Sequence, residues 1–358
     1  MTLKLSALDQ SVSLAGGSED AAIRDTVSLA EDCERLGYSR FWVSEHHGLP
    51  TIIGSAPEIV MAAIAARTHT IRIGSAGVML PHYSALKVAE QFRVLEALAP
   101  GRIDLGVGRA PGGDMRTARA LNPNAMAAAD QFPEQVRDLQ AWTSLGTHHG
   151  ITAHPLGPHA PEIWILGSSD YGAQLAAHFG LPYAFAYFFT DGIGAEQALA
   201  LYRRLYNPSE RHPKPQATLC IWALAAASDE EAAHLALSRD RWRIDRGRGR
   251  GVLGPLQSPD DIAARGFSSG EEQGLASMRA RAFVGSAKTV AARIAALVEE
   301  FGLDEVVINT WAHDPAVRRT SYAAIAAEFG LTAPVARMWP AATDTRSGRS
   351  ETAAARAR

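Results

Sequence analysis

Three titratable residues, Glu45, His46 and His47, directly follow a short apolar run at residues 40–43. A buried parallel strand that runs into polar residues indicates a site at its carboxyl end, where ligands of α/β folds bind. The histidine pair is therefore expected to shuttle a proton or to hydrogen-bond a ligand, with a buried structural imidazole as the alternative for His46. A metal site needs further ligands at matching spacing, and because neither this pair nor the loop histidines show it, no metal is expected.

Two further motifs suit a phosphate group. GSSDYG, residues 167–172, lies between a predicted strand and a predicted helix, where backbone amides and serine hydroxyls can cradle a phosphate. An ordinary helix cap is the alternative interpretation of this motif. Arg109, in GVGRAPGGD, follows another predicted strand and suits an anion clamp, whereas a lone arginine is otherwise a solvated charge. The glycines before Arg109 lack the third glycine of a dinucleotide fingerprint.

Eight predicted strands must position these groups, and a predicted helix follows each of them. This alternation is typical of βαβ units and a parallel sheet. It predicts an α/β fold, one (β/α)₈ TIM barrel over residues 1–340. The predicted strands span residues 3–8, 41–43, 71–80, 102–107, 162–166, 182–188, 217–226 and 305–309.

Two segments fall outside the barrel pattern. Residues 241–281 are rich in glycine, arginine and serine, which predicts an irregular insertion before the last βα unit and a lid over the barrel mouth. Residues 341–358 lack aromatic and branched apolar residues, and a disordered tail is expected there.

The overall composition narrows the class of protein. The chain has 358 residues, 47% of them hydrophobic, and a formal net charge of −3. It therefore lacks the basic surface expected for nucleic acid or an anionic membrane. Cys33 and Cys220 are isolated in apolar segments and are expected to be reduced. No secretion signal or membrane span is evident, and a cytoplasmic location is expected.

Four motifs together resemble the bacterial luciferase-like flavin monooxygenases, and in particular their single-chain branch. The resemblance continues through residues 304–330 and covers nearly all of the chain except the tail. The motifs are WVSEHHG at residues 42–48, RIGSAGVMLPHY at 72–83, GRIDLGVGR at 101–109 and LGSSDYGAQLAAHFGLP at 166–182.

The resemblance implies roles for individual residues. His46 matches the family's catalytic histidine beside the flavin, and Ala76-Gly77 matches a cis non-proline peptide under the isoalloxazine ring. Arg109 matches the arginine that contacts the flavin phosphate. The loop that holds this phosphate matches Gly167, Ser168, Ser169 and Tyr171, with Gly172 where the family often has serine or threonine.

The resemblance also implies the reaction. Reduced FMN, delivered by a separate NAD(P)H-dependent flavin reductase, would react with O₂ to form a C4a-peroxyflavin that oxidises a small organic substrate. A homodimer fits the family. Hydride transfer with coenzyme F420 and a non-catalytic flavin-binding protein are the alternatives. The substrate is not evident from the sequence: Trp222 and Trp311 lie near the expected substrate loops, but Trp222 is interpreted as barrel core.

Overall fold

All eight predicted strands are present and close into a parallel barrel. The computed structural model describes residues 3–109, 114–144, 146–247 and 253–333. Around the barrel the strands follow the order β9-β11-β1-β2-β3-β4-β7-β8, and β8 pairs again with β9. The (β/α)₈ prediction is thus confirmed. The barrel strands are β1 (Lys4–Asp9), β2 (Arg40–Val43), β3 (Arg72–Met79), β4 (Ile103–Gly108), β7 (Glu162–Gly167), β8 (Tyr183–Phe185), β9 (Ala217–Ala226) and β11 (Glu305–Asn309).

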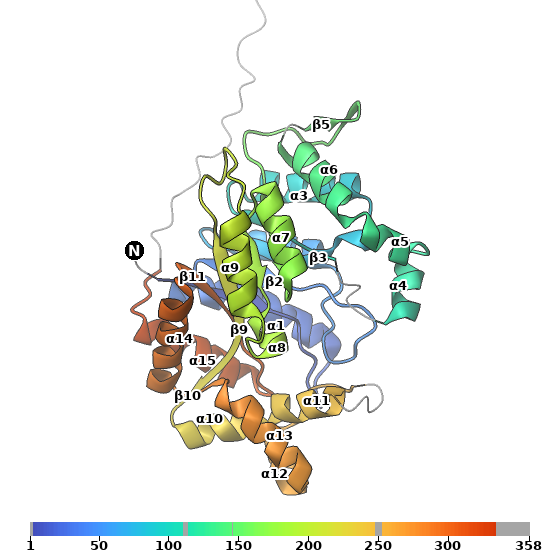
Figure 1. Ribbon diagram of the computed structural model, residues 1–358. Helices are drawn as coiled ribbons and strands as arrows, with labels where there is room; N and C mark the ends of the chain where they lie inside the picture. Colours follow the sequence, from blue (N-terminus) through green and yellow to red (C-terminus); the bar gives the residue numbers. More distant parts are fainter. Residues whose placement is uncertain (1–2, 110–113, 145, 248–252, 334–358) are drawn as a thin grey trace, which may run out of the picture.

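Helices surround this barrel on its outer side (Figure 1). Local signals set their ends: the Ser18 hydroxyl accepts a hydrogen bond from the Ala21 amide at the start of α1, and Gly37 ends this helix with a φ of 88°. The surrounding helices are α1 (Glu19–Leu36), α2 (Pro57–Ala65), α3 (Ala85–Leu98), α6 (Phe132–Ser144), α7 (Asp170–Phe179), α9 (Ala195–Leu205), α14 (Ala287–Phe301) and α15 (Pro315–Glu328).

The barrel interior is filled by side chains that alternate with those facing the helices. Its central layer is apolar and includes the two tryptophans Trp42 and Trp164, whose ring centroids lie 5.2 Å apart. The barrel is therefore a packed core below its mouth. The other buried members of this layer are Leu8, Ala184, Cys220 and Val307.

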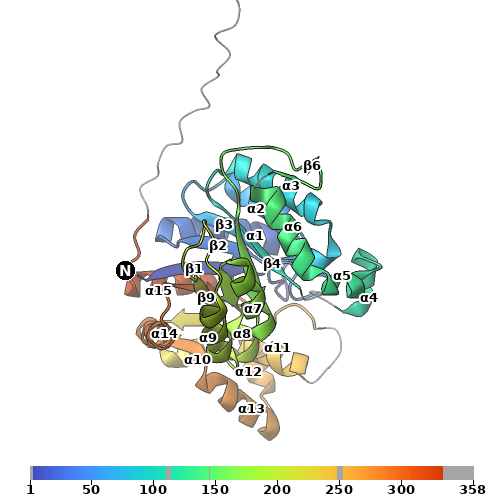
Figure 2. The ribbon, with the colours of Figure 1, turned by 45° about the horizontal axis from the view of Figure 1, so that its top comes forward.

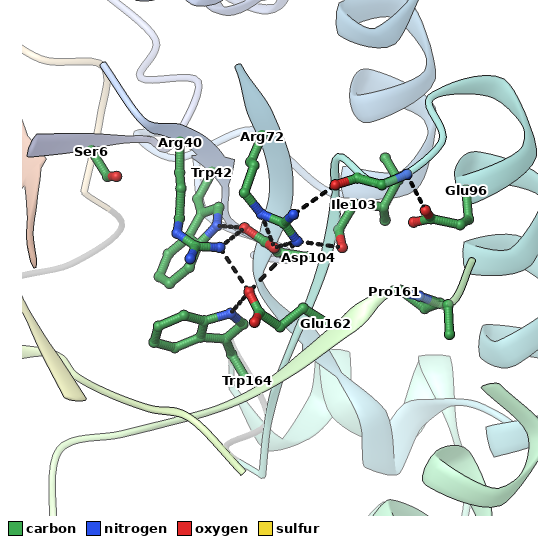
Figure 3. A network of polar contacts seen from close by, with 12 residues as sticks. Ser6, Arg40, Trp42, Arg72, Glu96, Ile103, Asp104, Pro161, Glu162 and Trp164 are labelled. Atoms are coloured by element: carbon green, nitrogen blue, oxygen red, sulfur yellow. Dashed lines mark hydrogen bonds and ion pairs between the residues drawn. The ribbon is translucent and has the colours of Figure 1, made fainter. Parts of the chain in front are cut away.

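A buried ion-pair network closes the end of the barrel where the strands begin (Figure 3). Arg40 lies 2.8 Å from Asp104 and 2.9 Å from Glu162, and the Trp42 indole N–H donates to Asp104 at 2.9 Å. Burial would raise the pKa of Asp104, but the guanidinium groups of Arg40 and Arg72 outweigh it and lower that pKa. The charges of this end are thus compensated inside the protein.

The insertion lies in the predicted place, but its described part is helical, so the prediction of an irregular segment over residues 241–281 is wrong there. A capping box of Ser268 and Glu271 starts one helix, and Ser258 caps another before Pro259. These helices were not predicted because the segment is rich in glycine and serine, which are poor helix formers. The segment contains α11 (Leu237–Gly247), α12 (Pro259–Arg265) and α13 (Ser269–Ala280), between α10 (Asp229–Leu235) and β10 (Phe283–Ser286), which pairs with β9.

Several further short elements lie between the barrel strands. They are α4 (Met115–Leu121), α5 (Ala125–Asp130), the hairpin of β5 (Thr147–His148) and β6 (Ile151–Thr152), the 3₁₀ turn η1 (Leu80–His82) and α8 (Tyr187–Thr190). The predicted disordered tail, residues 341–358, lies outside the described residues. Within the described part of the chain, no helix combines the length and apolar character needed to cross a membrane.

Candidate functional site

Four neighbouring strands bring the predicted site residues to one rim of the barrel. Strands β2, β3, β4 and β7 are adjacent and parallel. His46 follows β2, Ala76 and Gly77 lie toward the end of β3, Arg109 follows β4, and Ser168 follows β7. Because all four strands run in the same direction, these residues share the carboxyl-terminal mouth. The charged network of Figure 3 lies at the opposite end.

The two predicted phosphate motifs meet at this rim. The guanidinium carbon of Arg109 lies 4.3 Å from the ring centroid of Tyr171, although the two residues follow different strands. Both side chains are exposed, as are Ser168 and Ser169 at the start of α7, and Arg109 forms no ion pair with a described residue. The Tyr183 hydroxyl donates to the Ser169 carbonyl at 3.1 Å and holds the loop. This corner offers an open cationic group beside a helix N-terminus, which suits a phosphate.

Strands β3 and β4 pack closely together where Ala76 and Gly77 lie. The peptide bond between Ala76 and Gly77 is cis. A Cβ on Gly106 would lie 2.1 Å from the Ser75 carbonyl oxygen, and one on Gly77 would lie 2.7 Å from the Gly106 carbonyl oxygen. Strands β3 and β4 therefore approach too closely here for any side chain at either glycine. This close packing of the two strands therefore requires glycine at both positions.

His46 is held by its main chain and its ring. Its amide donates to the Gly54 carbonyl at 2.8 Å, and its Nδ1 lies 3.1 Å from the Ser44 hydroxyl. Burial, together with the charge of Arg246 and the neighbouring His47, lowers the pKa of His46 to about 4. The ring is neutral at pH 7, which suits a hydrogen-bonding role.

The structural role of Glu45 was not predicted from the sequence. Its carboxylate is 1% exposed and accepts hydrogen bonds from the Tyr83 hydroxyl at 2.7 Å and from the Met79 amide at 3.0 Å. The third contact is His47, whose Nε2 lies 2.7 Å from the same carboxylate. Glu45 thus ties the end of β2 to the end of β3, and the two adjacent histidines have separate partners. The sequence signal was the acidic residue directly before the pair.

The helical insertion contacts loops at the mouth of the barrel, while its action as a lid stays a prediction. The Trp242 indole N–H donates to the Thr51 hydroxyl at 3.0 Å, and its ring packs 4.8 Å from that of Trp311. The Leu256 amide donates to the Ser13 carbonyl at 2.8 Å. These contacts reach the loops after β2, β11 and β1, and Figures 1 and 2 both show α10 to α13 gathered at this end. The phosphate corner lies outside these contacts.

One group of three described residues could hold a metal ion, which the spacing of the histidines did not predict. Asp138 lies 3.1 Å from His148 and 3.8 Å from His149. These residues belong to α6 and the β5–β6 hairpin. The hairpin precedes β7 and lies at the end of the molecule away from α11 in Figure 1. The group is therefore remote from the rim.

Comparison with known proteins gives the family. The model described as luciferase-like monooxygenase matches residues 3–305, so the chain belongs to this family. YwcH of Bacillus subtilis (strain 168), an uncharacterized protein, is 41% identical over 316 residues, which cover 87% of this chain and 94% of YwcH. The N-acetyl-S-alkylcysteine monooxygenase of the same organism is 41% identical over 259 residues, which cover 70% of this chain and 76% of that enzyme.

Solved structures agree with this assignment. The structure of apo-MsnO8 is 32% identical, with a TM-score of 0.83, over 92% of this chain and 99% of MsnO8. Two more distant structures share the fold alone. One is the oxygenating constituent of 3,6-diketocamphane monooxygenase from Pseudomonas putida in complex with FMN (19% identity, TM-score 0.69, covering 92% and 98%). The other is an F420-dependent secondary alcohol dehydrogenase with an F420-acetone adduct (14%, 0.59, covering 90% and 98%).

Proposed function

We propose that this monooxygenase uses reduced FMN and O₂ to oxidise a small organic substrate. The observation that carries the proposal is the contact between Arg109 and Tyr171 at the start of α7, on the same rim as His46. Family membership and the FMN complex of a fold neighbour support the choice of cofactor. The exposed Arg109 and the start of α7 suit the charge of the FMN phosphate.

Two parts of the rim would hold the two ends of FMN. Arg109, the hydroxyls of Ser168 and Ser169, and the backbone from Gly167 into α7 would bind the phosphate. Tyr171 would keep the Arg109 guanidinium in place by stacking. The backbone at Ala76–Gly77 would face the flat ring system, as the resemblance to the family implies.

The chemistry is divided between cofactor and protein. Reduced FMN, when bound, would supply the two electrons that activate O₂. Since the pKa of His46 is about 4, its ring stays neutral. In the proposed tautomer the Ser44 hydroxyl would donate to Nδ1, which would leave the proton on Nε2 to donate a hydrogen bond. The helices of the insertion would exclude water from the mouth.

Electrons would come from elsewhere, because the glycines before Arg109 lack the third glycine of a dinucleotide fingerprint. A separate NAD(P)H-dependent flavin reductase is the proposed partner, as the description of one fold neighbour as an oxygenating constituent also suggests. The homodimer and the cytoplasmic location expected from the sequence stay predictions.

The decisive experiment compares cofactors with and without oxygen. The purified protein is titrated with FMN, with FMNH₂ and with reduced F420 under anaerobic conditions, and O₂ is then admitted together with an N-acetyl-S-alkylcysteine. This substrate is chosen because a relative with 41% identity is an N-acetyl-S-alkylcysteine monooxygenase. We expect FMNH₂ to bind and labelled O₂ to enter the product.

Each of the two alternative functions predicts a different result in this experiment. Turnover with reduced F420 in the absence of O₂ would show hydride transfer, the second candidate, which a fold neighbour with an F420 adduct keeps open. Flavin binding with no effect of a His46→Asn substitution on oxygen consumption would favour a non-catalytic flavin protein.

A further inference from the structure

Helix α11 presents a basic face to the barrel mouth. Residues at intervals of three and four share one side of a helix. The Arg243 guanidinium pairs with Asp191, after β8, at 2.6 Å, while the opposite side of α11 pairs with its own insertion, for example Arg241 with Glu271 at 3.1 Å. The mouth-facing side consists of Arg239, Trp242, Arg243 and Arg246.

Arg239 is a buried cation without an ion-pair partner among the described residues. It is 7% exposed, and it donates a long hydrogen bond to the Phe188 carbonyl at 3.4 Å. The two carboxylates whose charges act on Arg239 have partners of their own: Asp240 lies 2.8 Å from Arg279, and Asp191 pairs with Arg243. Burial, together with the charge of Arg243, lowers the pKa of Arg239 to about 9. A buried charge of this kind is stabilised by an anion.

Trp222 adds a second unsatisfied group beside this cation. The guanidinium carbon of Arg239 lies 4.2 Å from the Trp222 ring centroid. Trp222 alternates on β9 with residues facing the helices and so points into the barrel, one layer above Cys220. It is 3% exposed, and its indole nitrogen has no hydrogen-bond partner in the described protein. An indole N–H can only donate, and therefore calls for an acceptor.

We propose that Arg239 and the indole N–H of Trp222 bind the carboxylate of an anionic substrate. This inference rests on the proposed function, since it names the substrate class of the same site. A carboxylate is an acceptor only and can satisfy both donors at once. The site is distinct from the phosphate corner, because Arg239 and Trp222 lie beside β8 and β9 and Arg109 lies beyond β4.

The test uses benzoate as the probe and benzamide as its uncharged counterpart. Binding is followed by calorimetry and by quenching of tryptophan fluorescence. We expect benzoate to bind at least about tenfold more tightly than benzamide, because hydrogen bonds to charged groups are the stronger ones. Arg239→Gln and Trp222→Phe should each weaken benzoate binding about tenfold or more, and Arg239→Lys should restore part of it. Arg204→Gln, a change at an exposed arginine of α9, is the matched control.

The affinity for FMN separates this inference from the function on which it rests. It should be unchanged in Arg239→Gln. The inference is overturned if benzoate and benzamide bind alike, if benzoate does not bind at all, or if Arg239→Gln binds benzoate as the wild type does. It is also overturned if Arg239→Gln loses FMN, since the guanidinium would then serve the cofactor. Retained benzoate selectivity in a protein that does not bind flavin would leave the anion site standing and refute the proposed function alone.

Discussion

The replacement of Arg109 by alanine should weaken FMN binding without affecting riboflavin, which lacks the phosphate. The guanidinium stacks on Tyr171 and has no ion-pair partner among the described residues, so its charge is free for a phosphate. Two unit charges 4 Å apart attract by about 1 kcal/mol in water and by about 4 kcal/mol near a protein surface. Because Arg109 is exposed, a loss of about 1.5 to 2 kcal/mol is expected.

That free energy corresponds to a rise of about 10- to 30-fold in the Kd for FMN. The assay is a titration followed by flavin fluorescence, with both flavins and both proteins. The difference between FMN and riboflavin should shrink in the variant, and it should also shrink for the wild type as salt is added, because the group is exposed to solvent. Tyr171→Ala should give a smaller loss of the same kind.

Two results would refute the reasoning. One is an FMN affinity within twofold of the wild type, which would remove the phosphate from Arg109. The other is an equal loss for riboflavin, which would show that the substitution disturbs the rim as a whole.

Three further predictions concern the rest of the barrel. The pKa of His46 is about 4 in the folded protein and near 6.5 in the unfolded chain, so the unfolded chain takes up its proton first as the pH falls. The wild type should therefore lose about 3 kcal/mol of unfolding free energy relative to His46→Asn between pH 7 and pH 4, measured by urea unfolding. An equal dependence of the unfolding free energy on pH in both proteins would contradict this. Asp104→Asn should cost about 3 to 5 kcal/mol in the same assay but leave the Kd for FMN unchanged, since the network is remote from the rim. Gly106→Ala should cost about 3 kcal/mol and weaken FMN binding, because its Cβ would lie 2.1 Å from the Ser75 carbonyl oxygen, whereas Gly108→Ala, with no atom within 4 Å of its Cβ, should be tolerated.

Strand positions were predictable because each barrel strand is a short apolar run with a turn or a polar group at its end. That pattern placed His46, Arg109 and Ser168 at strand ends, and parallel pairing then required them to share a rim. The contact between Arg109 and Tyr171 follows from the adjacency of β4 and β7, which the chain order alone suggests.

The parts that escaped prediction depend on contacts between distant positions. Glu45 binds Tyr83, 38 residues away, and no local pattern marks the pair. The helices of the insertion were hidden because glycine and arginine obscure their apolar spacing. Trp222 was interpreted as core, and it is buried as expected; what the sequence could not show is that Arg239 would lie over its ring.

The helical cover begins in the chain after β9 and ends at β10, whereas Arg109 and Ser168 follow β4 and β7. Substitutions in the cover can therefore alter what enters the mouth without changing the contact between Arg109 and Tyr171 or the charged network at the opposite end of the barrel. A barrel of this kind can change its substrate range by substitutions in one part of its mouth. Helix α11 is therefore where sequence differences are expected between close relatives that act on different substrates.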